Sequence, residues 1–101
     1  TYTTAQVIQT IIKQHYNINL TIVFPNDLYL FTKKCGGILI QNTTQGNEHW
    51  LTIGIGLNIN TLTFPKSLES KATSLKRYSG KVYKINAIIE PITQNLIQHM
   101  T

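Results

Sequence analysis

Hydrophobic residues recur with two different spacings along this chain of 101 residues. Helical spacing predicts an amphipathic helix at residues 3–16, where Thr3 or Thr4 is placed to cap the first turn. Its apolar stripe consists of Val7, Ile8, Ile11 and Ile12. A second helix is predicted at residues 84–100, where Pro91 either kinks the helix or marks its true first turn. Its apolar stripe consists of Ile85, Ile88, Ile89, Ile92, Leu96 and Met100.

Apolar and polar residues alternate between these two segments, which indicates β-strands. Three short strands are expected at residues 17–24, 28–31 and 34–41, followed by a polar loop at 42–47. A fourth strand is expected at residues 49–60, with one apolar face turned to the core. That face consists of Leu51, Ile53, Ile55, Leu57 and Ile59.

The other face of the fourth strand carries small and polar residues. Gly54 and Gly56 leave it almost bare, and Asn58 follows them. Glycine weakens a strand, so two glycines on one face need a reason. Either a ligand lies flat on this face, or a helix packs closely against it. The strand pattern alone leaves both explanations open.

The order of predicted elements is helix, four strands, helix, with short connections between the strands. This order favours a single α+β domain, in which a mainly antiparallel sheet has its helices packed to one side. Residues 61–84 are predicted to be irregular. No β-α-β alternation is present, so Gly54-x-Gly56 is not a dinucleotide-binding fingerprint, which needs a third glycine and a following helix.

Composition excludes several classes of protein. The net charge is +5, but the basic residues between 66 and 84 are spread out and lack interleaved aromatic residues, so we do not expect nucleic acid binding. No apolar run approaches the roughly 20 residues of a membrane span, and no signal peptide is visible. The single cysteine excludes an internal disulfide and favours the reducing cytoplasm. Histidine, cysteine and acidic residues show no metal-ligand spacing.

Three motifs carry candidate chemistry. They are "FPNDLYLFTKKCGGILIQ" at residues 24–41, "IGIGLNIN" at 53–60 and the shorter "KATSL" at 71–75. The first resembles the motif of biotin protein ligases in which a Trp-Pro-Asn-Asp turn leads to a lysine and then to a Gly-Ile-Leu strand. The second is similar to the next strand of the same family, a Gly-x-Gly followed closely by asparagine. Turn, lysine, glycine strand and asparagine occur here in the family's order.

The resemblance implies an enzyme that joins biotin to ATP, forming biotinyl-5'-AMP, and then transfers biotin to a lysine of a biotin carboxyl carrier domain. It implies a partial class II synthetase-like fold, with residues 1–101 as the C-terminal part of the catalytic domain. The family's Gly-Arg-rich biotin loop is absent, since Arg77 is the only arginine. We therefore expect the missing N-terminal half of the domain as a partner, and an isolated chain that is inactive. The resemblance also allows a homodimer of the complete protein.

The resemblance assigns site residues one by one. Lys34 would be the cation that contacts the biotin carboxylate and the α-phosphate, and Asp27 would lie near the attacking amine. Further biotin contacts would come from Gly37 and Gly54. Nucleotide contacts would come from Asn26, Gly56, Leu57 and Asn58. The substrates would be biotin and ATP with Mg²⁺, and no metal ligated by the protein alone is expected.

The match to the family is incomplete, and other readings stay open. Phe24 replaces the motif's tryptophan, and Ala72 lies where some members carry a large side chain over adenine. Lys33 is expected to be an ordinary exposed lysine, and Cys35 to pack in the core. The alternatives are a lipoate or octanoyl transferase on the same scaffold, and a non-catalytic binding remnant. The Pro-Asn-Asp turn with Gly-x-Gly-x-Asn favours biotin.

Overall fold

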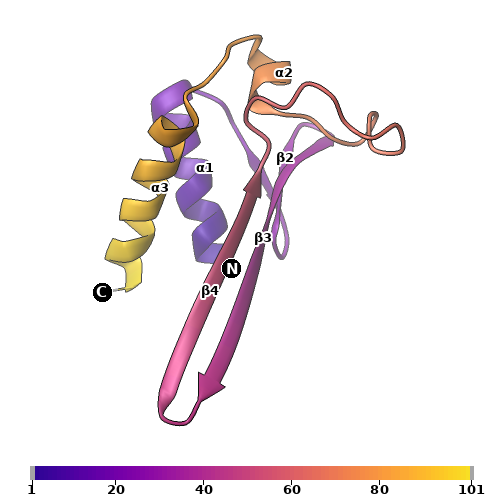
Figure 1. Ribbon diagram of the computed structural model, residues 1–101. Helices are drawn as coiled ribbons and strands as arrows, with labels where there is room; N and C mark the ends of the chain where they lie inside the picture. The colour runs from indigo at the N-terminus through magenta and orange to yellow at the C-terminus, as the bar shows by residue number, and fades with distance from the viewer. Residues whose placement is uncertain (1, 101) are drawn as a thin grey trace.

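The computed structural model describes residues 2–100 and shows two long helices on one face of an antiparallel sheet (Figure 1). The strands are β1 (Thr21–Val23), β2 (Asp27–Leu30), β3 (Lys33–Gln45) and β4 (Glu48–Leu57), and they lie in the order β1-β2-β3-β4. The helices are α1 (Tyr2–Tyr16), α2 (Leu75–Ser79) and α3 (Ile85–Met100). All three strand pairs are antiparallel, which confirms the predicted α+β class.

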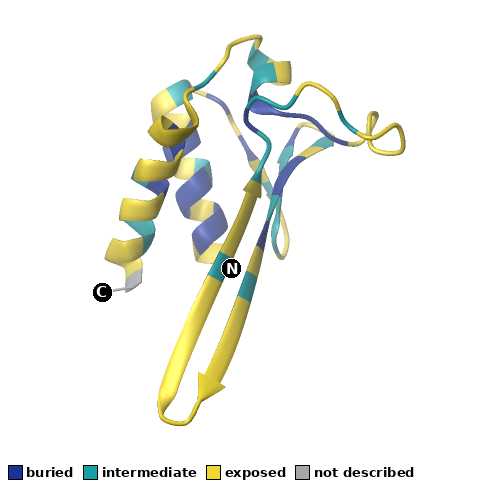
Figure 2. Cartoon of the chain, in the orientation of Figure 1, coloured by how far each residue is buried: buried dark blue, intermediate teal, exposed yellow. Residues whose placement is uncertain are grey.

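The core lies between the helices and the part of the sheet nearest to them. The apolar stripe of α1 is buried as predicted, and Ile88 and Ile92 of α3 complete the helical layer. The sheet contributes Leu28, Leu30, Cys35 and Ile38 to the same core. Figure 2 shows that burial is concentrated here and that the far half of the β3–β4 hairpin is exposed. The sheet face away from the helices is therefore free to carry a site.

The β3–β4 hairpin is longer than the sequence pattern predicts. Pairing continues to Gln45 opposite Glu48, so the polar loop predicted at residues 42–47 is wrong and the turn is only Gly46-Asn47. Gly46 has φ 63°, a conformation that glycine adopts without a steric cost. A two-stranded ribbon exposed on both faces needs no apolar alternation, which explains why polar residues form these strands.

The predicted core face of β4 is only partly buried. Leu51 and Ile55 are 51% and 36% exposed, so their assignment to the core is wrong, while Ile59 is buried beyond the strand end. The reason is geometric, because the ribbon extends past the helices that would cover it (Figure 1). The alternation of apolar residues correctly identified which face of β4 is turned to the helices. It could not show how far along the strand the helices extend.

Several element boundaries differ from the predictions. α1 begins at Tyr2, so Thr3 and Thr4 lie inside the helix and do not cap it. Pro91 lies within α3 and not in its first turn, and the side chain of Met100 is outside what the structure describes. The segment predicted to be irregular contains α2, capped by Ser74 and ended by Gly80 with φ 77°. Within residues 2–100, no helix combines the length and apolar character needed to cross a membrane.

Candidate functional site

The site begins at the tight connection between β1 and β2. This turn places Asn26 and Asp27 at the start of β2, directly beside β3. Asp27 pairs with Gly37, and the carbonyl oxygen of Asn26 accepts a 2.9 Å hydrogen bond from the amide of Ile38. The Asn-Asp pair is therefore held against the glycine end of β3 by main-chain pairing.

An irregularity in the β2–β3 ladder decides where Lys34 points. Leu28 pairs with Gly36, but the next residue, Tyr29, pairs with Lys34, so Cys35 is an extra residue on β3. Strict alternation would put Lys34 and Gly37 on opposite faces. The extra residue shifts the phase by one, as a β-bulge does. Lys34 consequently shares the face of Asp27 and Gly37.

Lys34 and Asp27 form an ion pair on this face. The Lys34 Nζ lies 3.2 Å from the Asp27 Oδ1, and the two side chains are 48% and 31% exposed. At such exposure the pair contributes little to stability because water screens it. The ion pair instead fixes the position of the Lys34 amine. Because this amine is also in contact with water, an anionic ligand can replace the Asp27 carboxylate as its partner.

The ion pair lies beside a first hollow of about 480 Å³ on the open sheet face. β3 and β4 supply its floor, where Gly37 pairs with Gly56 and Leu39 with Gly54. Asn26, Asp27 and Lys34 lie at one end of it. The structure thus brings together six predicted site residues, namely Asn26, Asp27, Lys34, Gly37, Gly54 and Gly56.

A second hollow of about 610 Å³ adjoins the first. The two share Lys34, Gly37 and Gly56. The outer side of the second hollow consists of residues 61–73, which we call the wall loop. From this loop come Thr61, Thr63, Phe64, Pro65, Leu68, Lys71 and Ala72. Sequence reasoning missed Phe64 and Lys71, because an irregular segment gives no periodic signal for which side chains turn inward.

Among residues 2–100, no helix covers the bare face of β4. A Cβ atom at Gly54 would come within 3.5 Å of the Leu39 carbonyl oxygen, and one at Gly56 would be 3.9 Å from that of Gly37. Both are ordinary contacts with the neighbouring strand. The explanation of these glycines by close helix packing is therefore wrong, and the open face remains available to a ligand.

Gly37 and Gly36 differ from this pair. A Cβ at Gly37 would lie 3.6 Å from the Lys34 Nζ and 3.5 Å from the Asp27 Oδ1, so glycine here leaves room around the ion pair. At Gly36 a Cβ would overlap the carbonyl oxygen of Gly56. Glycine at position 36 is thus required by the fold itself.

The two remaining predicted site residues are placed differently. Leu57 turns its side chain to the helix face, where it packs against the core, so any contact with a ligand on the open face would come from its main chain. Asn58 lines the second hollow, and its side-chain amide donates a 3.3 Å hydrogen bond to the carbonyl oxygen of Thr73. Asn58 therefore also fixes the end of the wall loop.

Cys35 and Lys33 line neither hollow, although Lys33 is half-buried and not fully exposed as predicted. Cys35 is fully buried, and burial raises the pKa of its thiol to about 12, so it stays protonated at neutral pH. Its Sγ lies 3.5 Å from the carbonyl oxygen of Asn58. Lys33 pairs with Leu30 at the start of β3 and lines neither hollow. Among the described residues, no three His, Cys, Asp or Glu side chains gather closely enough to hold a metal ion.

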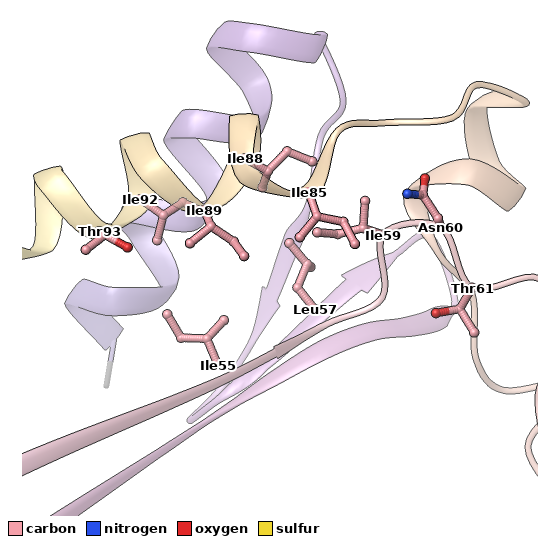
Figure 3. Close-up of a pocket in the computed structure, with 10 residues that line it drawn as sticks. All are labelled: Ile55, Leu57, Ile59, Asn60, Thr61, Ile85, Ile88, Ile89, Ile92 and Thr93. Carbon is pink, nitrogen blue, oxygen red and sulfur yellow. The ribbon is translucent and has the colours of Figure 1, made fainter.

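A third hollow, of about 590 Å³, lies on the helix side between β4 and α3 (Figure 3). Its lining is mostly aliphatic and includes Ile55, Leu57, Ile59, Ile85, Ile88, Ile89 and Ile92. No charged side chain lines it, so it offers nothing to orient a carboxylate or a phosphate. The chemistry of the chain is concentrated on the opposite face.

Comparison with known proteins identifies the family of this chain. The sequence pattern of the Biotin/lipoate A/B protein ligase family matches residues 1–58, more than half of the chain. The chain belongs to this ligase family. The matched residues end at Asn58 and include every predicted site residue.

Individual members of the ligase family show the extent of the likeness. The Bifunctional ligase/repressor BirA of Bacillus spizizenii is 35% identical over 78 residues, covering 74% of this chain and 24% of that protein. A Biotin--protein ligase of Homo sapiens is 37% identical over 49 residues, or 48% of this chain and 7% of the human protein. The chain therefore spans about a quarter or less of these relatives.

A solved structure of the ligase family shares the fold. Biotin protein ligase from Aquifex aeolicus, in complex with biotin and ATP, superposes with a TM-score of 0.80 at 21% identity. The match covers 94% of this chain and 39% of that one. At this level of identity the likeness establishes the common α+β fold.

Proposed function

We propose that this chain carries the adenylate half of the active site of a biotin protein ligase, which attaches biotin to a lysine of a biotin carboxyl carrier domain through biotinyl-5'-AMP. The observation that carries the proposal is the position of Lys34. It lies at the junction of two hollows on a sheet face floored by glycines, paired with Asp27. Biotinyl-5'-AMP is a mixed anhydride, in which an acyl part and a nucleotide part meet at an anionic phosphate. The surface likewise consists of two hollows that meet at a cationic side chain, Lys34.

The proposed placement follows the two hollows. Biotin would lie along Gly37 and Gly54 in the first hollow, with its carboxylate at Lys34. The nucleotide would extend from Gly56 toward Asn58 in the second hollow, where Lys71 adds a second cation. Asn26 lines the first hollow at the end near Lys34, so a nucleotide contact from it would be to the phosphate end and not to adenine.

In the first step a carboxylate oxygen of biotin would attack the α-phosphorus of MgATP. The bond between the α-phosphorus and the oxygen that bridges to the β-phosphate would break, and pyrophosphate would leave with that electron pair. Negative charge then builds on the oxygens around the α-phosphorus. Lys34 has three N–H donors and would stabilise that charge from a fixed position, which is the kind of interaction that lowers a barrier most. The side-chain oxygen of Asn26 suits the phosphate-bound Mg²⁺ that accompanies ATP as substrate.

In the second step the lysine amine of the carrier domain would attack the acyl carbon, and AMP would leave. The amine must lose a proton as the amide bond forms. Asp27 would orient this amine or accept its proton, because its carboxylate lies beside Lys34 at the junction. Anion binding would draw the Lys34 amine away from Asp27 and leave that carboxylate able to interact with the incoming amine.

The chain would act as the C-terminal part of the catalytic domain, residues 1–101, together with a further N-terminal half that supplies an arginine-rich loop. The exposed isoleucines around the third hollow, Ile55, Ile85 and Ile89, support further packing on this side. We place the activity in the cytoplasm, where carrier domains and ATP are available. Homodimerisation of the complete protein is part of the same proposal.

The test is binding of a non-hydrolysable biotinyl-AMP analogue and of its lipoyl counterpart, measured by calorimetry with the complete ligase domain. We expect the biotinyl compound to bind more tightly and Lys34→Ala to weaken it strongly. Lys33→Ala is the matched control, since Lys33 lines neither hollow. Tighter binding of the lipoyl compound would assign the chain to lipoate or octanoyl transfer, which the family also contains.

A further inference from the structure

The wall loop is joined to the site lysine through the main chain. The amide of Lys34 donates a 2.8 Å hydrogen bond to the carbonyl oxygen of Lys71, and the amide of Thr73 donates a 2.9 Å hydrogen bond to the carbonyl oxygen of Lys34. Residues 71–73 therefore pair with β3 at Lys34, as a short parallel bridge with Ala72. A displacement of the wall loop would be transmitted directly to the backbone of Lys34.

Ser74 closes the base of the wall loop from inside the protein. Its side chain is completely buried. The hydroxyl donates a 2.6 Å hydrogen bond to the carbonyl oxygen of Thr61, where the loop begins. It also accepts a 3.1 Å hydrogen bond from the amide of Arg77 in α2. One hydroxyl thus joins the first residue of the wall loop to the helix that follows the loop.

Without the Ser74 hydroxyl, the carbonyl oxygen of Thr61 would lose a buried partner. The loop would then be held at its far end by the 71–73 pairing and by Asn58. Its near end would be held only through the residues before Thr61, by the bonds of Ile59 to Lys76 and of Asn60 to Tyr83. Phe64, Pro65 and Leu68 lie between these two ends and line only the second hollow. The first hollow has no residue from the wall loop, so its floor would not be altered.

We propose that Ser74 is a positioning residue for the second hollow. Its hydroxyl fixes the near end of the wall loop so that the loop and Lys34 present a preformed surface to the nucleotide. The inference rests on the proposed function, because it takes the second hollow as the nucleotide side. It assigns Ser74 a larger effect on nucleotide affinity than on biotin affinity, because the wall loop reaches the first hollow only through Lys34.

The test uses the complete ligase with two Ser74 variants. Both Ser74→Ala and Ser74→Gly remove the two hydrogen bonds of the hydroxyl. They differ in helix stability, because glycine at an N-cap position retains most of the stability of a capped helix and alanine does not. Both variants should raise the KM for MgATP about tenfold, the usual effect of losing one buried hydrogen bond. The KM for biotin should rise clearly less, because Lys34 is the point at which the wall loop touches the lining of the first hollow. Ser74→Thr keeps the hydroxyl and should restore the KM for MgATP.

Ser79→Ala is the matched control. Ser79 ends the same helix, and its hydroxyl likewise takes part in two hydrogen bonds, accepting both from the Lys81 amide and the Tyr83 hydroxyl. Neither partner belongs to the wall loop. It should leave both KM values unchanged. Hydrogen exchange in the chain itself gives a readout without ligand, and the Lys34 and Thr73 amides should exchange faster in Ser74→Gly than in Ser79→Ala.

Three results would overturn the inference. One is an unchanged KM for MgATP in Ser74→Gly, which would make Ser74 a helix cap only. Another is an equal rise in both KM values, which would indicate general loosening of the fold. If the unsubstituted ligase binds neither MgATP nor biotin, the proposed function fails first and the inference fails with it, a result visible before any variant is made.

Discussion

Alanine substitutions at three glycines of the β3–β4 ladder should separate the demands of the fold from those of the ligand. Gly36, Gly54 and Gly56 all lie in the ladder, yet they differ in the space around them. A Cβ at Gly36 would overlap the Gly56 carbonyl oxygen and lie 3.2 Å from the Leu57 Cα. Both neighbours are backbone atoms, so relief requires the two strands to separate locally.

The magnitudes follow from that contrast. Overpacking of this kind costs about 1–3 kcal/mol, which corresponds to a fall in Tm of roughly 5–20 °C for a domain of this size. At Gly54 and Gly56 the added methyl makes ordinary contacts, the nearest being 3.5 Å and 3.9 Å. Alanine is better than glycine in a strand by about 0.5–1 kcal/mol, so these two variants should match or exceed the original stability.

The assay is thermal unfolding of the chain followed by circular dichroism, with analogue binding by the complete ligase measured in parallel. Gly54→Val and Gly56→Val should abolish binding of biotinyl-AMP, because valine would occupy the floor of the hollows while suiting a strand. A fall in Tm at Gly54 or Gly56 equal to that at Gly36 would refute the reasoning about space. Full binding by either valine variant would refute the ligand floor.

Three further results are expected. In the complete ligase Lys34→Ala should slow pyrophosphate release about 10²–10³-fold, as the loss of one preorganised charge contact does, while Lys33→Ala should not; equal effects would show that the wrong lysine was chosen. Because burial raises the pKa of Cys35 to about 12, the thiolate fraction at pH 9 is about a thousandth, so iodoacetamide should label it only after unfolding. Rapid labelling of the folded chain would contradict its burial. The chain alone should not biotinylate a carrier domain, whereas adding the N-terminal half of the catalytic domain should restore transfer, and robust activity of the chain alone would contradict the proposed division of the site.

The ionisation of Cys35 also sets a direction for stability against pH. Its folded pKa of about 12 lies above the unfolded value of 9.0. Above pH 9 the unfolded chain therefore loses a proton that the folded chain retains, and stability falls as the pH rises toward 12. Cys35→Ala removes this contribution, so the difference in unfolding free energy between variant and original should change over pH 9–12 and stay constant below it.

The sequence predicted the fold class well because each prediction rested on a local pattern. The apolar stripe of α1 and the alternation through Ile53, Ile55 and Leu57 each depend on neighbours within a few residues. The errors concern burial and strand pairing, which depend on segments that are distant in the sequence. Leu51 has the right periodicity but lies beyond the reach of the helices, and the polar residues at 42–45 form a strand because a facing strand pairs with them.

The site shows the same division at finer scale. Counting by twos from Gly37 places Lys34 on the wrong face, and nothing in the letters Lys-Cys-Gly-Gly marks Cys35 as the extra residue. Resemblance to the ligases selected Lys34 without any geometry. The structure adds the reason that this lysine can act there, since the shifted pairing with β2 turns it toward Asp27.

Lys34 is also the point at which otherwise distant segments meet. β2 pairs with it through Tyr29, the wall loop pairs with it through Ala72, and the Asn58 amide binds the carbonyl oxygen of the next residue, Cys35. Each segment carries one of the three motifs recognised in the sequence. The motifs are separated along the chain, but the fold brings them together around Lys34. Lys34 is held on two sides by main-chain pairing and its neighbour Cys35 on a third, so the backbone here loses little freedom when a ligand binds. That preorganisation favours Lys34 as the fixed cation, because Lys33, one position earlier, is paired only with Leu30 at the strand end.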